Sequence, residues 1–396
     1  MNANLPLENI KILDLSRVLA LPYATMILSD LGAEVIKVER PVLGDETRHW
    51  GPPFLGSESA YFLCVNRNKK SITIDIKKRE GQKIIHNLAS ICDVFVENYR
   101  VGELKKYSLD YENIKKINPS IVYCSLTGYG QNGPKSHLPG YDFIMQGESG
   151  LMSITGTQKG QPMKVGVAIL DIVSGLYAAV AIIASLYKRQ KINKSEYIDL
   201  ALYDCAVASL ANVASNYLVS GKIPKRYGNA HPNIVPYQTF KAKDKYFNLA
   251  VGNDEQFKKL TELLSEDYLK QEKFKKNADR VRNRKELIKI LQSIFATKKA
   301  SYWVELFESH NIPSGYINNL KEVFEDDQLI ARNMISVINH TFGTLKLVSS
   351  PIKLMNSSIK KPQNPPLLGQ DTADVLKNLL HYQESDIECL KKQNII

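Results

Sequence analysis

The chain has 396 residues, of which 44% are hydrophobic and 23% charged, which is the composition of an ordinary globular protein with a large core. Its length favours two domains over one. The formal net charge of +11 allows an anionic partner, but the lysines are spread along solvent-facing stretches such as 270–276 and lack the clustering of nucleic-acid surfaces. If this charge has a partner, we expect a small phosphorylated ligand and no nucleic acid.

Other bulk features exclude further classes of protein. Residues 1–13 show neither the basic and apolar pattern of a secretory signal nor the Arg-rich pattern of a transit peptide, which predicts a cytoplasmic address. The longest apolar stretch, 172–187, falls short of the roughly 20 residues that span a bilayer, so we expect a buried helix and no membrane association. The five cysteines show no C-x-x-C spacing, so neither a disulfide framework nor a metal site is expected.

Strand and helix signals alternate from the N-terminus to about residue 125. The predicted strands are 10–15, 34–38, 71–76, 93–97 and 121–125, and the predicted helices are 22–31, 79–90 and one from Gly102. This alternation predicts a Rossmann-like, doubly wound, mostly parallel sheet with ligands at the carboxyl ends of its strands. No G-x-G-x-x-G follows the first strand, which disfavours a dinucleotide dehydrogenase.

The rest of the chain predicts a long loop, a key helix and a second domain. Glycines recur from 126 to 166 and predict a functional loop that leads to the apolar helix 172–187. Lys-rich helical stretches with a strand at 246–251 then predict a smaller α+β domain. The predicted division assigns the large α/β domain to 1–200 and 330–396, the small domain to 225–325, and linkers to 200–225 and 325–345.

Asp171 stands directly before the apolar helix, and its local sequence allows two interpretations. An aspartate at a helix N-cap accepts hydrogen bonds from free amides and complements the helix dipole. A carboxylate at a helix start can also attack a thioester carbonyl as a nucleophile. Nothing in the local sequence decides between the two.

A series of short motifs follows in a fixed order around Asp171. The motifs are LDLSRV (13–18), GAEVIKVE (32–39), GDETR (44–48), NRNKKSI (66–72), VENYR (96–100), GYD (140–142), VG (165–166) and PLLGQDT (366–372). In this order and spacing they resemble the class III coenzyme A (CoA) transferases, the family of formyl-CoA and carnitine CoA-transferases, over nearly the whole chain. Segments 163–168 and 227–237 resemble the succinate-hydroxymethylglutarate CoA-transferase branch most.

The resemblance implies a set of site residues. The catalytic aspartate of the family falls on Asp171, and the substrate-binding positions fall on Gly140, Tyr141, Asp142 and Trp50. The implied CoA contacts are Val18, Leu19, Ala20, Arg40, Ile74, Lys77, Asn98, Tyr99, Arg100 and Lys106. The cations among them suit a ligand with a pyrophosphate and a 3′-phosphate. CoA thioester is implied as a substrate, with no permanently bound cofactor.

The implied reaction moves CoA from an acyl-CoA, with succinyl-CoA as the expected donor, to a free carboxylic acid, with a dicarboxylate as the expected acceptor. It runs through an aspartyl anhydride and an aspartyl-CoA thioester on Asp171, and amides at the start of the helix are expected to stabilise the oxyanions. The family also implies an intertwined homodimer.

Two alternatives stay open. The related 2-methylacyl-CoA racemases share the fold and the aspartate but carry His before the Asp of the Gly-x-Asp segment. The tyrosine at this position, Tyr141, has an ordinary pKa of about 10 and is a poor base, so it favours transfer. The other alternative is a CoA-binding protein without turnover, which the intact Asp171 disfavours.

Overall fold

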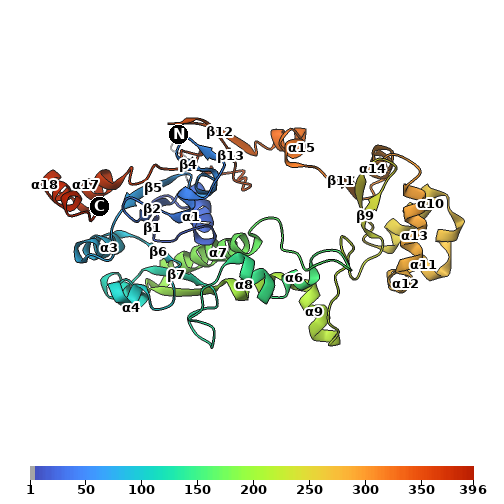
Figure 1. Cartoon of the computed structure of the whole chain (residues 1–396), viewed down its shortest axis with the longest axis horizontal. Helices are drawn as coiled ribbons and strands as arrows, with labels where there is room; N and C mark the ends of the chain where they lie inside the picture. Colours follow the sequence, from blue (N-terminus) through green and yellow to red (C-terminus); the bar gives the residue numbers. More distant parts are fainter. Residues whose placement is uncertain (1–4) are drawn as a thin grey trace. The chain divides into compact units, whose positions relative to one another are not determined.

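The structure is a computed structural model that describes residues 5–396, and the chain divides into two compact units (Figure 1). The first unit contains the residues up to 151 together with 165–211 and 327–396. The second contains 152–164 and 212–326. Each unit has an apolar core of its own.

A parallel sheet of six strands forms the centre of the first unit. In spatial order its strands are β5 (Lys69–Thr73), β2 (Glu34–Glu39), β1 (Lys11–Asp14), β6 (Val94–Glu97), β7 (Val122–Thr127) and β8 (Glu196–Ala201). This sheet confirms the predicted parallel α/β architecture. The direction of winding reverses at β1, which pairs with β2 on one side and β6 on the other, and such a reversal is where doubly wound sheets bind ligands.

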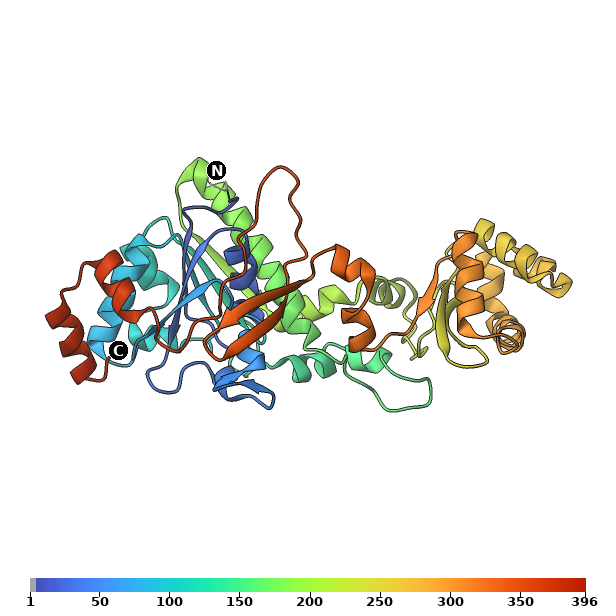
Figure 2. The same ribbon diagram turned by 90° about the horizontal axis from the view of Figure 1, so that it is seen from above.

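Helices cover both faces of this sheet because its central strands β1 and β6 carry apolar residues on both faces. Along β1, Ile12 packs into one layer and Leu13 into the other. The first layer contains α1 (Ala20–Asp30), α5 (Asp142–Glu148), α7 (Ile169–Ile192) and α8 (Leu202–Ser209). The second contains α3 (Arg79–Ile91), α4 (Tyr111–Ile117), α17 (Thr372–Leu380) and α18 (Glu384–Lys392). Figure 2 shows the two C-terminal helices beside α3 and α4.

The helix α7 is longer than the apolar stretch 172–187 predicts. It has 24 residues because its helical pattern continues through polar residues to Ile192. Within residues 5–396 it is the one helix long and apolar enough to cross a membrane, judged by length and composition alone. The expectation that this segment is too short to span a bilayer was therefore wrong, although its side with Ala178 and Ile182 packs against the sheet as a core helix does.

The second unit is built on an antiparallel sheet of β9 (Tyr237–Lys241), β10 (Tyr246–Ala250) and β11 (Ser314–Tyr316). Its core is aromatic, with Phe295 in edge-to-face contact with Phe247 and Trp303. Its main helices are α10 (Asp254–Leu264), α13 (Arg284–Phe295) and α14 (Ala300–Ser309).

Short elements complete the chain. These are η1 (Glu46–His49), β3 (Phe54–Leu55), β4 (Glu58–Ser59), α2 (Ala60–Leu63), η2 (Leu104–Tyr107), α6 (Leu151–Ile154), α9 (Ala211–Ser220), η3 (Asp267–Lys270), α11 (Glu272–Lys275), α12 (Asn277–Arg282), α15 (Leu320–Phe324), α16 (Asp327–Ala331), β12 (Ile335–His340) and β13 (Gly343–Val348).

Several predicted elements need correction. The third strand begins at Lys69 rather than at 71, because Lys69 pairs with Val35 in the ladder. No helix starts at Gly102, whose positive φ of 78° is foreign to a helix, and η2 and α4 follow instead. The loop predicted over 126–166 contains α5, and the polar strand β8 lacked an apolar signal.

Candidate active site

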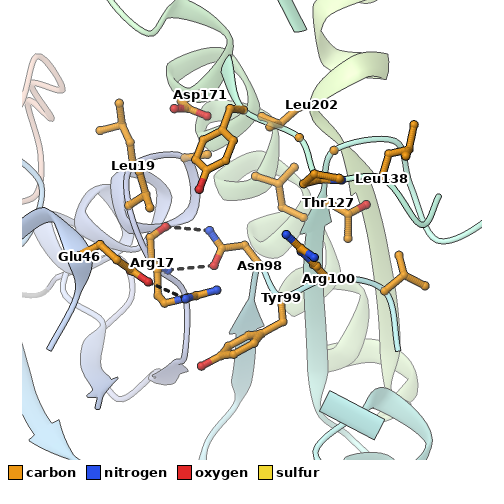
Figure 3. A pocket seen from close by; sticks show the side chains of 18 of the residues that line it. Arg17, Leu19, Glu46, Asn98, Tyr99, Arg100, Thr127, Leu138, Asp171 and Leu202 are labelled. Atoms are coloured by element: carbon orange, nitrogen blue, oxygen red, sulfur yellow. Dashed lines mark hydrogen bonds and ion pairs between the residues drawn. The ribbon is translucent and has the colours of Figure 1, made fainter. Parts of the chain in front are cut away.

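A cavity of about 320 Å³ opens at the carboxyl ends of β1 and β6, where the winding of the sheet reverses (Figure 3). Its lining comes from four segments of the first unit, which are 17–20, 98–101, 126–128 and 138–141, together with Glu46, Trp50, Ser136, Asp171 and Leu202. In Figure 3, Asp171 lies at one end of this cavity and Tyr99 at the other. The volume is that of a small-molecule site.

A smaller pocket adjoins the cavity, because Arg17 and Tyr99 line both. Its other walls are formed by 37–40 at the end of β2, by Gly44 and Asp45, and by Ile74 and Ile76 after β5. The two pockets together follow the carboxyl ends of neighbouring strands from β5 through β2, β1 and β6 to β7. An elongated ligand therefore has a continuous row of surfaces on which to lie.

The structure brings most of the predicted site residues to these pockets. The cavity is lined by Val18, Leu19, Ala20, Trp50, Asn98, Tyr99, Arg100, Gly140, Tyr141 and Asp171, and the smaller pocket by Arg40 and Ile74. Lys77 and Lys106 line neither of them. Lys77 is exposed, and the exposed ammonium of Lys106 lies 2.7 Å from the carboxylate of Glu103.

Asp171 is the third residue of α7, not the cap that precedes it, because the helix begins at Ile169. Within residues 5–396 no donor forms a hydrogen bond with its half-buried carboxylate. Burial and, after it, the nearby negative charge of Asp142 together raise the pKa of Asp171 to about 7. The side chain is therefore a partly desolvated carboxylate, free of partners, that changes its charge near neutral pH.

Asp142 supplies the cap that Asp171 does not. Its Oδ1 accepts hydrogen bonds from the amide of Leu170 at 2.8 Å and of Asp171 at 3.4 Å. Its Oδ2 accepts one from the Gln146 side chain at 2.6 Å, and the residue is buried. Asp142 thus already binds both of these amides. The expectation that amides at the start of the helix stabilise the oxyanions is therefore wrong for these two.

The loop that carries Tyr141 and Asp142 is fixed by two glycines in direct backbone contact. A Cβ on Gly140 would lie 2.3 Å from the Cα of Gly128, which no side chain permits. This contact ties the end of β7 to the start of α5. It places Asp142 under the first turn of α7 and leaves Tyr141 exposed in the cavity wall.

Tyr61 belongs to this region, although no sequence signal indicated it. It lies on α2 in edge-to-face contact with Trp50, with ring centroids 5.2 Å apart. Burial raises the pKa of Tyr61 to about 12, and the charge of Asp171 is the next cause. Its hydroxyl therefore stays protonated at neutral pH. A lone tyrosine on a four-residue helix offers no motif from which to find it.

At the other end of the cavity Arg17 is held by three partners. Its guanidinium lies 2.7 Å from the carboxylate of Glu46 and 4.7 Å from the centroid of the Tyr99 ring. The side chain of Asn98 accepts a hydrogen bond from the Arg17 amide at 2.9 Å and donates one to the Arg17 carbonyl at 2.7 Å. Asn98 thus uses its polar atoms to hold the loop after β1, while Arg100 contributes a cation to the wall.

The comparisons with known proteins agree with this geometry. The sequence model described as CoA-transferase family III matches residues 7–372. The chain is 49% identical to succinyl-CoA:glutarate CoA-transferase of Mus musculus, over 99% of this chain and 90% of the mouse protein. It is 41% identical to succinate-glutarate CoA-transferase of Agrobacterium fabrum, over 96% of each chain. A crystal structure of a CAIB/BAIF family protein from Brucella suis is 42% identical, with a TM-score of 0.84 over 95% of this chain and 100% of that one.

Proposed function

Because the chain belongs to CoA-transferase family III and is a CoA-transferase, we propose that it moves CoA from succinyl-CoA to glutarate or a dicarboxylate of similar length. The relatives named for succinyl-CoA and glutarate support this choice. The observation that carries the chemistry is the unpartnered carboxylate of Asp171 in the cavity at the winding reversal of the sheet.

In the first half-reaction a carboxylate oxygen of Asp171 attacks the thioester carbonyl of succinyl-CoA, and the CoA thiolate leaves. This gives a mixed anhydride between Asp171 and the succinyl group. The thiolate then attacks the aspartyl carbonyl of the anhydride and releases succinate, which leaves an aspartyl-CoA thioester. One difficult transfer is split into steps that each exchange a single acyl bond.

In the second half-reaction the acceptor carboxylate attacks the aspartyl carbonyl and the CoA thiolate leaves again. The thiolate attacks the acceptor side of the new anhydride, so that glutaryl-CoA forms and the Asp171 carboxylate returns. No proton is gained or lost over the cycle. CoA stays in the cavity throughout, which suits a site that extends along the ends of several neighbouring strands.

The raised pKa of Asp171 supports a role as nucleophile. A carboxylate that lacks hydrogen-bond donors keeps its electron pairs available for attack, and its basicity is higher than that of a solvated aspartate. Tyr61, which stays protonated beside it, is our candidate donor to the oxyanions, in place of the helix amides that Asp142 occupies.

For CoA itself we propose contacts with the residues that line the two pockets. Val18 to Ala20 and Asn98 to Arg100 line the cavity that contains Asp171, and Arg40 and Ile74 lie in the smaller pocket. We propose that the first unit is the CoA-binding domain on these grounds. Lys77 and Lys106 reach CoA only if their exposed side chains turn toward it.

We also propose a homodimer. The side of α7 that faces away from the sheet carries an apolar stripe with helical spacing, formed by Leu176, Tyr177, Val180, Ile183 and Tyr187. All five are exposed in the single chain, and exposed apolar patches of this kind mark interaction surfaces. A second copy of the chain is the occupant that the homodimer of the family implies.

Racemisation of 2-methylacyl-CoA is the second candidate on this fold. It requires two groups that exchange protons with one carbon from opposite faces. In the cavity lining the residue before Asp142 is Tyr141, and no histidine lines the cavity among the described residues. The geometry thus favours transfer.

The test is to incubate the protein with succinyl-CoA, digest it, and map adducts by mass spectrometry, with Asp171→Ala as the control. A hydroxylamine-sensitive adduct on the peptide with Asp171, and glutaryl-CoA after addition of glutarate, are the expected results. Transferase activity in the Asp171→Ala variant would refute the mechanism. Deuterium incorporation into a 2-methylacyl-CoA would show racemase activity instead.

A further inference from the structure

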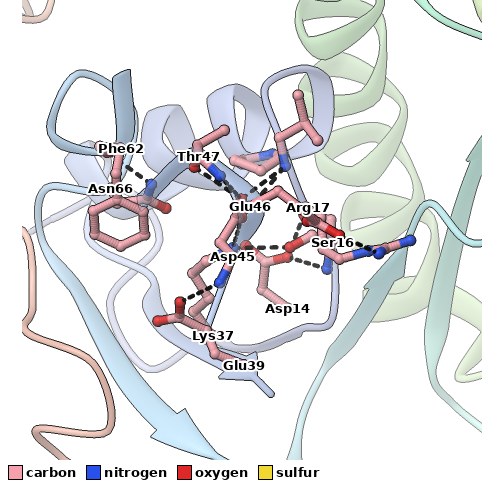
Figure 4. A network of polar contacts seen from close by, with 12 residues as sticks. Asp14, Ser16, Arg17, Lys37, Glu39, Asp45, Glu46, Thr47, Phe62 and Asn66 are labelled. Atoms are coloured by element: carbon pink, nitrogen blue, oxygen red, sulfur yellow. Dashed lines mark hydrogen bonds and ion pairs between the residues drawn. The ribbon is translucent and has the colours of Figure 1, made fainter. Parts of the chain in front are cut away.

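The turn between β1 and α1 is held by side chains at five successive backbone polar groups (Figure 3 and Figure 4). The amide of Ser16 donates to Asp14 at 2.9 Å, and its carbonyl accepts from the Lys37 ammonium at 2.8 Å. The amide and carbonyl of Arg17 both bind the side chain of Asn98. The remaining amide, that of Val18, donates to the carboxylate of Asp45 at 3.3 Å.

The backbone conformation of Val18 explains why the turn needs these hydrogen bonds. Its φ is 68°, in the left-handed region that a β-branched residue almost never adopts. The segment that follows starts α1, and both Leu19 and Ala20 line the cavity. The direction in which α1 presents its first residues to the cavity therefore depends on an unfavourable backbone conformation at Val18.

Asp45 is well placed to enforce this conformation. Its side chain and that of Lys37 are fully buried and form an ion pair at 2.9 Å. The other oxygen of Asp45 accepts from the amide of Thr47 at 3.0 Å and from its hydroxyl at 2.8 Å. These contacts lower the pKa of Asp45 to about 2, so the carboxylate keeps its charge at every working pH.

We propose that Asp45 is a positioning residue for CoA, which acts by holding Val18 in the left-handed conformation and so sets the cavity wall formed by Leu19 and Ala20. The buried Lys37 fixes Asp45, and Asn98 holds the preceding residue from the opposite side. The proposal rests on the proposed function, because CoA is the ligand that the wall serves.

Glycine provides the decisive test, because it adopts a positive φ without strain. The variants are Asp45→Asn in three backgrounds, namely wild type, Val18→Gly and Val18→Ala. Alanine is the matched control, since it removes the valine methyl groups but keeps the Cβ that makes the conformation unfavourable. The measurements are kcat and KM for succinyl-CoA and the dissociation constant of CoA by calorimetry.

We expect Asp45→Asn to raise KM and the dissociation constant about tenfold in the wild-type and Val18→Ala backgrounds, with little change in kcat. In the Val18→Gly background we expect a rise of no more than about threefold, since the strain that Asp45 counters is gone. Equal rises in the glycine and alanine backgrounds, or a loss in kcat with unchanged KM, would overturn the proposal.

A second variant is used if Asp45→Asn does not fold, because that substitution leaves the Lys37 ammonium buried without its partner. Thr47→Val removes the hydroxyl that donates to Asp45 at 2.8 Å, and so loosens the hold on Val18 without leaving a buried charge unpaired. The same rescue by Val18→Gly and not by Val18→Ala is expected. Absence of this rescue would refute the inference. A wild-type protein that binds no CoA and transfers none would refute the proposed function, whereas an active wild type without the rescue would refute the positioning role alone.

Discussion

Replacing Asp142 with asparagine removes one negative charge beside Asp171 while keeping a side chain of the same length. Two unit charges about 4 Å apart repel by about 4 kcal/mol at an effective dielectric constant of about 20, and by about 1 kcal/mol in water. Burial is the larger cause of the raised pKa of Asp171 and the charge of Asp142 the smaller one. We therefore expect the variant to lower the pKa of Asp171 by about one pH unit, or about 1.4 kcal/mol.

The assay is kcat/KM for succinyl-CoA between pH 5 and pH 9, whose acid limb reports the ionisation of the free enzyme. In the wild type the midpoint of the acid limb should lie near the pKa of Asp171, which is about 7. In Asp142→Asn it should move toward acid, because the nucleophile then ionises at lower pH.

Asp142→Ala is the control for the role of Asp142 as a helix cap. It removes the same charge and also the acceptor for the amides of Leu170 and Asp171, at a cost of about 1 kcal/mol of stability. The two variants should shift the acid limb equally, while the alanine variant melts at a lower temperature. A limb that stays in place in Asp142→Asn, or moves toward alkali, would refute the electrostatic reasoning.

Three further predictions concern stability and assembly. Burial raises the pKa of Asp171 to about 7, so the folded protein holds this proton more tightly than the unfolded chain, and stability falls as pH rises from about 4 through 7. Asp171→Asn should abolish transfer. At pH 8 its free energy of unfolding should exceed that of the wild type by up to about 4 kcal/mol, and this difference should shrink toward pH 5. Gly175→Ala should lower both the melting temperature and CoA affinity, since its Cβ would lie 2.5 Å from the carbonyl of Ala20, and equal affinity would contradict this packing. Val180→Glu should convert a dimer to a monomer in light scattering, whereas Met355→Glu, at an even more exposed site outside α7, should not.

The sheet was predictable because its signal is carried by local apolar runs. In β6, Val94 and Val96 pack into one helical layer and Phe95 into the other, so three consecutive positions are apolar and the run stands out in the sequence. The strand β8 lacks such an apolar run, because it carries Glu196 and Asp199, and it was therefore not predicted. The homodimer and the cytoplasmic address stay predictions.

The site was predictable only in part, because its contacts join distant segments. The ordered motifs placed Asp171, Tyr141 and the turn at Val18 on one cavity. Tyr61 reaches the same region from a four-residue helix with no motif of its own. Lys106 looked like a phosphate ligand beside a strand end, but its nearest anion is Glu103, one helical turn away.

The sequence around Asp171 allows a residue that caps its own helix, and the chemistry explains why the cap in the structure is a different residue. A carboxylate that accepts two amide hydrogen bonds is stabilised in its charged form, which lowers its pKa and weakens it as a nucleophile. Asp142, 29 residues away in the sequence, accepts the amides of Leu170 and Asp171. Asp171 thereby keeps a fixed position at the helix start, and its carboxylate is not weakened as a nucleophile by amide hydrogen bonds. Since the cap and the nucleophile lie on different elements, only the folded chain shows that one aspartate makes the other available.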